Sequence, residues 1–231
     1  MIRYSTKLAV WAALICLLAS AAPGQEAATP DGRGFFLSLS GQQLDLRGDF
    51  SGEMTLWHFE KAFFIPRLNK DFGLGLGIGF RSESGLWEFN VLRSNQRALW
   101  SGTESQASIY VLEINGWGFP WKHSVVQGYY LLGLCFPFLI VRDGSRMAGS
   151  IFDASYTGLG VNLGAGLLLN LGHRLFISGG FKYRFMGFFY VSGGGKGRDI
   201  QDLTVGYQGS AWGQWLRAPS LGLTFGIGLI L

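Results

Sequence analysis

The sequence predicts an all-β protein: an up-and-down antiparallel transmembrane β-barrel of about eight strands. Three observations favour this fold. Past residue 33 apolar residues alternate with small or polar ones at a period of two, only 15% of all residues are charged, and the connecting segments include both short turns and long loops. Typical soluble domains carry roughly 25% charged residues, so this chain has too few charges to cover a surface that faces water.

The first 24 residues are predicted to be a cleaved secretory signal peptide. Arg3 and Lys7 give it a positive start, and the apolar run 8–19 has signal-peptide length but is too short to span a membrane comfortably. We place the cleavage after residue 24, because a cut two residues earlier would leave Pro23 beside the cleaved bond, where its fixed ring fits a protease groove poorly. An uncleaved anchor helix is the alternative.

Cleavage would leave residues 25–33 as a short periplasmic N-terminal segment ahead of a barrel domain, 34–231. It also removes Cys16, so Cys135 becomes the lone cysteine and is expected to be a small apolar packing residue. The formal charge of +4 loses the two positive charges of the signal and falls to about +2. With no cluster of basic residues, this charge argues against a nucleic-acid partner.

The strands are read from the alternation of side chains. It is clearest at 72–80, where phenylalanine, leucine and isoleucine alternate with glycine, and it recurs at 159–169 and 221–231. Successive side chains of a strand point to opposite faces, so one face is apolar and the other nearly bare, whereas a helix would scatter the apolar residues. The strands are expected at 34–47, 72–81, 86–98, 105–117, 127–140, 157–169, 175–190 and 219–231.

The connecting segments predict which side each end of the barrel faces. Short to medium connections are expected at 82–85, 118–126 and 170–174, and on the other side a brief one at 99–104 with long loops at 48–71, 141–156 and 191–218. Short turns on one side and mostly longer loops on the other are typical of outer-membrane barrels. An even number of strands starting in the periplasm also ends there, so the cell outer membrane is the expected location.

Two other architectures stay open at this point. Hydropathy alone would allow a helical span at 125–141, but glycines, Pro137 and β-branched residues make that stretch a poor helix and an acceptable strand. A soluble β-sandwich or periplasmic barrel would have to explain long apolar stripes confined to one face of each strand.

Two stretches resemble the small outer-membrane barrels of the OmpA, OmpX and OmpW type. Residues 77–90 resemble their strand, short periplasmic turn and returning strand, and 158–166 with 182–185 resemble a later hairpin. The resemblance covers most of residues 34–231. It implies an eight-stranded barrel in the outer membrane.

The C-terminus resembles the insertion signal read by the barrel-assembly machinery, which would then be a partner during biogenesis. That signal has a polar residue, a glycine two positions on, and hydrophobic or aromatic residues at the third-last and last positions. These places are filled by Thr224, Gly226, Leu229 and Leu231. The usual terminal aromatic residue is missing.

If the apolar faces point to lipid, the opposite faces point into the lumen and bring charges there. Arg81, Glu88 and Glu113 are expected to form a cluster, with Lys182 and Arg184 approaching from across the barrel. Charges in a narrow lumen of low dielectric must pair or lose their charge. The cluster is therefore expected to be a salt-bridge plug that makes the barrel rigid, with a proton- or ion-binding gate as the alternative.

Further along the barrel the inward positions turn apolar, at Leu92, Ile109, Val111 and Leu131. A barrel of eight strands is just wide enough for its own side chains or for one small ligand. Inward-facing glycines would free some volume. The pattern thus allows an apolar pocket open to the outside, as the OmpW resemblance would imply, or a filled core.

Three functions follow from these patterns. The first is a non-enzymatic narrow channel or pocket for small hydrophobic compounds, and the second is a structural or surface-interaction, adhesin-like protein that acts through loops 48–71 and 191–218. An enzyme acting on lipopolysaccharide acyl chains ranks last, because His123 and His173 would lie in periplasmic turns and only His58 outside. No metal-ligand spacing and no cofactor motif is present, and outer-membrane lipid and lipopolysaccharide are the expected surroundings.

Overall fold

The computed structural model describes residues 33–58, 61–120, 125–172, 174–193, 196–199, 204–205 and 215–231. The predicted signal peptide, nearly all of segment 25–33, and His123 and His173 lie outside the described residues.

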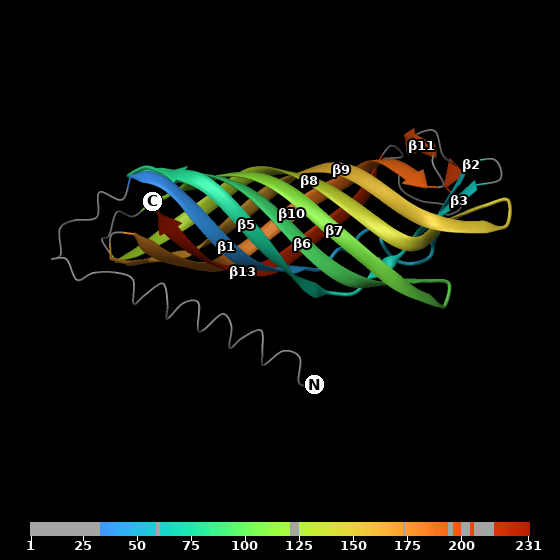
Figure 1. The fold of residues 1–231 in the computed structure, drawn as a ribbon, viewed down its shortest axis with the longest axis horizontal. Coiled ribbons are helices and arrows are strands. Elements are labelled where there is room, and N and C mark those ends of the chain that lie inside the picture. The colour runs from blue at the N-terminus through green and yellow to red at the C-terminus, as the bar shows by residue number, and fades with distance from the viewer. Residues whose placement is uncertain are drawn as a thin grey trace.

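Eight long antiparallel strands form a closed ring (Figure 1). They are β1 (Gly34–Leu44), β5 (Asp71–Arg81), β6 (Gly85–Trp100), β7 (Thr103–Gly118), β8 (Val126–Met147), β9 (Ser150–Leu171), β10 (Leu175–Gly193) and β13 (Leu216–Ile230). Each pairs with the next along the chain, and β13 closes the ring by pairing with β1, where Phe36 faces Ile230. The predicted all-β antiparallel barrel of eight strands is confirmed, and closure removes the open sheet edges.

The outer wall of this ring is apolar. Along β6 buried and exposed residues alternate from Leu86 to Ala98, as one face turns inward and the other outward. The outward side chains are unusually exposed for their type, with Leu76 68% and Trp87 67% exposed. Similar exposed residues on the remaining strands include Phe35, Leu37, Ile114, Leu132, Leu134, Val161, Leu163, Phe181, Phe185, Leu221 and Leu223. A band of this kind around a closed barrel is the surface that faces lipid.

The two ends of the barrel differ. At the end that holds the C-terminus, which we call the short-turn end, brief connections join β5 to β6, β7 to β8 and β9 to β10. At the opposite loop end lie five short strands: β2 (Met54–His58), β3 (Lys61–Ile65), β4 (Arg67–Leu68), β11 (Lys196–Asp199) and β12 (Thr204–Val205). β2 and β3 form a hairpin, and β3 continues the sheet by pairing with the tip of β8, where Lys61 faces Met147 (Figure 1).

The structure corrects one predicted loop. Residues 141–156 were expected to be irregular, but most of them form the ends of β8 and β9, joined by a tight turn at Ala148 and Gly149. The ladder bends at a bulge between Val141 and Ser145 and then continues. Beyond the lipid a strand no longer needs an apolar outer face, so the alternation that marks the other strands is lost while the pairing persists.

The helical alternative for 125–141 is wrong, because these residues lie mostly in β8. No helix long and apolar enough to cross a membrane occurs within the described parts of the chain.

Candidate functional site

The lumen is the candidate site, and its side chains form three layers along the barrel axis. At the short-turn end lies an apolar cluster of Phe36, Leu86, Phe119, Tyr129, Leu131, Leu168, Phe176 and Ile230. The middle layer is polar, with Gln42, Glu88, Asn90, Glu113, Asn115, Asn162, Lys182 and Arg184 all buried. A second, larger apolar cluster fills the loop end.

Glu113 is the centre of the polar layer. Its carboxylate, fully buried, accepts hydrogen bonds from Lys182 Nζ at 2.9 Å and from Arg184 Nε at 2.7 Å. Asn90 Nδ2 donates to the same carboxylate at 3.0 Å, and Arg184 also donates to Gln42. The structure therefore joins three of the five predicted charges into one buried ion-pair network, which spans the lumen from β7 to β10.

Glu88 lies in the same layer, and none of the ion pairs among the described residues includes it. Ser38 Oγ donates to its carboxylate at 2.7 Å. With Arg81 lying apart, the layer holds two basic side chains, Lys182 and Arg184, and two acidic ones, Glu88 and Glu113, which balance in charge when all four are ionised. A balanced set of charges is what a buried, poorly solvated layer can hold.

Inward-facing glycines of β5 make this layer possible. A Cβ atom on Gly77 would come within 2.7 Å of Glu88 Oε1, and one on Gly75 within 2.9 Å of Asn90 Oδ1. We expected such glycines to leave free volume in the lumen. Side chains of both neighbouring strands cover them instead, Ser38 and Ser40 of β1 and Glu88 and Asn90 of β6, so the volume is used.

Arg81 does not join the cluster in which the sequence placed it. Its guanidinium donates to Gln127 Oε1 at 3.0 Å and lies over the rings of Phe119 and Phe176, 5.7 and 5.5 Å from their centroids. No ion pair of the described residues includes it. The register explains the difference: Arg81 faces Leu86, whereas Glu88 faces Gly79 further along the hairpin, and the long side chain reaches the aromatic cluster at the short-turn end.

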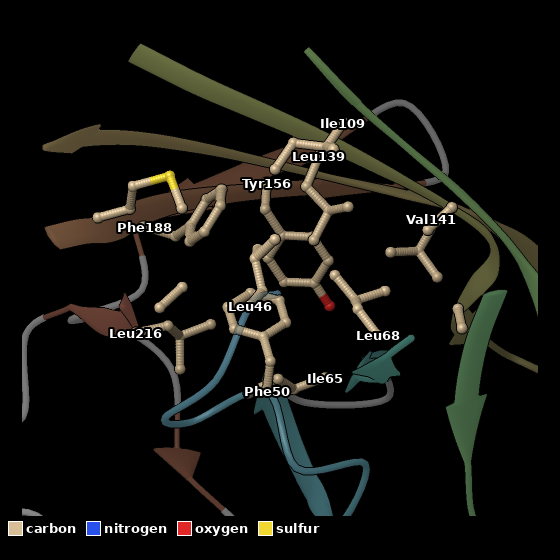
Figure 2. Packing of buried hydrophobic residues seen from close by; sticks show 14 of the residues in the cluster. Leu46, Phe50, Ile65, Leu68, Ile109, Leu139, Val141, Tyr156, Phe188 and Leu216 are labelled. Atoms are coloured by element: carbon tan, nitrogen blue, oxygen red, sulfur yellow. The ribbon is translucent and has the colours of Figure 1, made fainter. Parts of the chain in front are cut away.

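Of the two possibilities for the apolar inward positions, a pocket or a filled core, the packing in the structure matches a filled core. Leu92, Ile109 and Val111 are fully buried in the loop-end cluster, together with Leu139, Tyr156 and Phe188 of the ring. Leu131 was expected beside them but packs in the other cluster, at the short-turn end. Residues that do not belong to ring strands fill the space at the loop end. They are Leu46, Phe50, Ile65 and Leu68, which Figure 2 labels, together with Leu56 and Phe63. We call this segment, 46–68, the plug.

Specific contacts hold the plug in place. Tyr156 donates its hydroxyl hydrogen to the carbonyl oxygen of Phe64 at 2.6 Å, and the buried Lys61 donates to the carbonyl oxygen of Gly193. The Phe50 ring lies 5.2 Å from that of Phe188 and 6.1 Å from that of Tyr156 between centroids (Figure 2). Sequence reasoning missed Phe50, because a single aromatic residue among polar neighbours carries no strand or helix pattern.

A small cavity lies beside the polar layer. It is lined by hydroxyl groups of Ser38, Ser40, Ser178 and Thr224 together with Glu88 and Lys182, and by apolar residues of the short-turn end. Its free volume is about 20 Å³, which is roughly the room that one water molecule needs.

Two further sets of predicted residues can be placed. Of the insertion-signal residues, Thr224 and Gly226 lie in β13 on the inward face, Leu229 on the outward face, and Leu231 follows the strand at 69% exposure. His58 lies in β2, but its side chain is outside the described residues. Within the described ranges no three His, Cys, Asp or Glu side chains are grouped so that they could hold a metal ion.

The class of protein follows from the closed ring and its apolar outer wall: this is a transmembrane β-barrel with the fold of the small eight-stranded outer-membrane proteins. The resemblance to the OmpA, OmpX and OmpW type is confirmed at the level of the fold. An antiparallel barrel of this kind belongs in the outer membrane.

Solved structures similar to this chain include Neisserial surface protein A (NspA), with 14% identity over 86% of this chain and 97% of that one and a TM-score of 0.49. The outer membrane protein OprG from Pseudomonas aeruginosa has 12% identity over 86% and 96%, with a TM-score of 0.49. Ail, the attachment invasion locus protein of Yersinia pestis, has 14% identity over 84% and 98%, with a TM-score of 0.35. No family model and no curated protein matches the chain.

Proposed function

We propose that this protein is a non-enzymatic barrel whose lumen is shut and whose loop end, displayed on the cell surface, binds a partner there. The observation that carries the proposal is the packing of the lumen in three successive layers. Two of these are apolar clusters of buried side chains and the third is the ion-pair network around Glu113. A barrel filled in this way offers a solute no path, so its activity is expected at its outer surface.

The tip of the β8–β9 hairpin is the most prominent part of that surface. On β8 the last outward apolar residue is Ile140, and the strand continues for seven residues beyond it, about 23 Å at 3.3 Å per residue. The extension carries exposed Arg142 and Arg146 on β8 and exposed Ile151, at 61%, on β9. A single apolar residue among charged ones on a projecting hairpin suits contact with another macromolecule better than it suits lipid.

This extension is held firmly. β3 pairs with β8 from Lys61 opposite Met147 to Phe63 opposite Ser145, so the hairpin is braced by the plug. Ser105 Oγ donates to the carbonyl oxygen of Arg142 at 2.9 Å from the neighbouring strand β7. A braced surface loses little conformational entropy when a partner binds.

Two measurements test the proposal, one on the refolded protein and one on cells. In planar lipid bilayers we expect no conductance above that of the bare membrane. In cells that display the protein, shortening the hairpin by deleting residues 143–152 is expected to abolish adherence to host-matrix or envelope partners, while the heat-dependent gel shift of a folded barrel is kept. Steady conductance, or unchanged adherence in every assay after the deletion, would contradict it.

A pocket for small hydrophobic compounds is the second candidate, and one observation favours it. Gln96 and Ser94 of β6 are buried at the level of the loop-end cluster, and neither Gln96 side-chain atom nor Ser94 Oγ has a hydrogen-bond partner within the described structure. Buried polar groups usually have partners, and the polar end of a ligand could supply them if the plug moved aside. Saturable binding of a hydrophobic fluorophore by the protein in nanodiscs, lost in Gln96→Leu, would favour this candidate.

The non-enzymatic part of the proposal has its own test. A His58→Ala variant is expected to leave the acylation pattern of lipopolysaccharide unchanged in cells that make the protein. A change in that pattern would revive the enzyme hypothesis.

A further inference from the structure

The outer wall of the barrel carries one patch whose chemistry differs from the apolar band around it. On β6 the outward residues Trp87, Phe89 and Val91 are exposed and apolar, as lipid requires. The next three outward positions on the same strand are Arg93, Asn95 and Arg97. On the neighbouring strand β7 the outward Ser108 donates to Asn95 Oδ1 at 3.0 Å, so the polar stretch covers two strands.

Four exposed cations gather there: Arg67, Lys70, Arg93 and Arg97, which we call the basic patch. Arg67 faces Leu99 across the β4–β6 ladder, and partners in a ladder share a face. Lys70 follows Asn69, whose backbone N–H donates to the carbonyl oxygen of Arg97 at 3.0 Å. The patch is therefore continuous along the outer side of β6.

The basic patch has an excess of positive charge. Arg97 pairs with Glu104 at 3.4 Å, an exposed contact, but no described ion pair includes Arg93, Arg67 or Lys70. Arg93 lies over the ring of Tyr110, 5.4 Å from its centroid.

Two other arginines at the loop end do have acidic partners. Arg47 pairs with Asp45 at 2.7 Å, and Arg217 lies 3.9 Å from Asp49. The hairpin tip exposes Arg142 and Arg146, which no described ion pair includes, but it also exposes Asp143 and Asp153, so acids match its arginines in number. The basic patch differs from both places because its four cations face fewer acids.

We propose that the basic patch binds the phosphate groups of lipid A, the phosphorylated glycolipid of the outer leaflet. Guanidinium groups form charge-assisted, often bidentate hydrogen bonds with phosphate. Arg93 stands directly beside Leu74 in the β5–β6 ladder and next to Val91 on its own strand, so a phosphate bound there carries its acyl chains onto exposed apolar side chains. Tyr110 takes the interfacial position that its amphipathic ring favours.

This combination selects a lipid over a soluble anion. A free phosphate would gain the charge contacts alone, at an exposed site where salt screens them. A lipid with phosphates and several acyl chains gains both the charge contacts and the apolar wall. The inference rests on the proposal that the loop end faces the outside of the cell, but not on the proposed partner of the β8–β9 hairpin.

The test is native mass spectrometry of the mature protein released from detergent micelles with added bisphosphorylated lipid A. The variant Arg93→Gln/Arg97→Gln is compared with Arg142→Gln/Arg146→Gln, which removes the same charge from the hairpin tip. We expect the first variant to bind lipid A about tenfold or more weakly, since each basic residue at an anionic surface contributes about fivefold, and the second to bind as the wild type does. A heat-dependent gel shift checks that both variants are folded.

Comparing the binding of different lipids identifies the ligand. Lipid A stripped of its phosphates and phosphatidylglycerol are both expected to bind at least about tenfold more weakly than intact lipid A. Equal binding of phosphatidylglycerol, displacement of lipid A by millimolar inorganic phosphate, or equal affinity of wild type and Arg93→Gln/Arg97→Gln would each overturn the proposal. Cell fractionation distinguishes failure of the lipid A site from failure of the outer-membrane location. If the protein is found in the outer membrane but does not bind lipid A as expected, only the lipid A site is contradicted.

Discussion

The middle and the loop end of the lumen are both packed, but the side chains that fill them come from different parts of the chain. In the middle, Glu113, Lys182 and Arg184 all belong to strands of the ring. At the loop end, much of the packing comes from the plug, 46–68, whose strands lie outside the ring. A layer built from ring strands cannot leave without breaking the ring, whereas the plug can unpack while the ring stays closed. The polar layer in the middle should therefore govern the stability of the whole barrel, and the plug only the stability of the loop end.

Breaking the ion-pair network should have the largest effect. Glu113→Ala leaves Lys182 and Arg184 buried without their carboxylate, and removing one partner of a buried pair costs about 3–5 kcal/mol. We expect this loss in the free energy of unfolding, measured by urea titration of the protein in lipid vesicles. The triple variant Glu113→Leu/Lys182→Met/Arg184→Leu should recover most of it, because it leaves no uncompensated charge. An unchanged free energy in Glu113→Ala would show that the network does not hold the middle layer.

Breaking the plug should have a smaller effect on the free energy of global unfolding, because the loss is confined to the loop end. Phe50→Ala removes a ring packed on Phe188 and Tyr156, and truncating a buried phenylalanine costs about 3 kcal/mol or more. We expect faster amide hydrogen exchange in β2 and β3, with β7 unchanged. Ser51→Ala, at an exposed neighbour, is the control. If exchange in β7 accelerated equally, the plug and the ring would be one cooperative unit and the comparison would fail.

Crowding the polar layer tests how tightly it is packed. In Gly77→Ala the new Cβ would lie 2.7 Å from Glu88 Oε1 and also meet Ser38, and overpacking of this kind costs about 1–3 kcal/mol. Gly179→Ala is the matched control, because nothing lies within 4 Å of a Cβ built there. Urea titration should separate the two variants. Equal stability would mean that the polar layer has room to shift.

The smallest effect is expected from a single hydrogen bond of the plug. Tyr156→Phe removes the donor to the carbonyl oxygen of Phe64, worth about 1 kcal/mol, and hydrogen exchange in β3 should quicken by roughly fivefold. Tyr183→Phe, on an outward and partly exposed tyrosine, should leave that exchange unchanged. If Tyr183→Phe accelerated hydrogen exchange in β3 as much as Tyr156→Phe does, the effect could not be assigned to the hydrogen bond between Tyr156 and Phe64.

The ring could be predicted because a lipid-facing surface imposes a regular pattern on the sequence of each strand. Every outward residue in the membrane must be apolar, so the alternation at 72–80 or 221–231 shows both the strand and its orientation. Beyond the lipid that rule ends, and the strand tips at 141–156 escaped prediction for this reason. The inward positions of Glu113, Lys182 and Arg184 follow from the same alternation.

Other parts of the lumen could not be predicted from the sequence. The partner of Arg81 depends on how far a long, flexible side chain reaches, and parity says only that it points inward. The apolar residues of 46–68 could have faced lipid, a partner or the lumen, since no periodicity distinguishes these choices. Leu131 has the same inward parity as Leu92, and only the tilt and register of the strands assign them to different layers.

The ladder between β1 and β13 joins the first ring strand to the last, with Phe36 opposite Ile230 and Gln42 opposite Thr224. Until residues 216–230 arrive, β1 and β10 each display an unsatisfied edge, and the sheet is a curved ribbon open on one side. Closure therefore needs β13, the last strand of the chain, whereas the pairings from β1 through β10 can form before it. An incomplete barrel would need both unpaired strand edges shielded from other chains. The ladder between β1 and β13 is the place where an assembly factor could release the closed barrel.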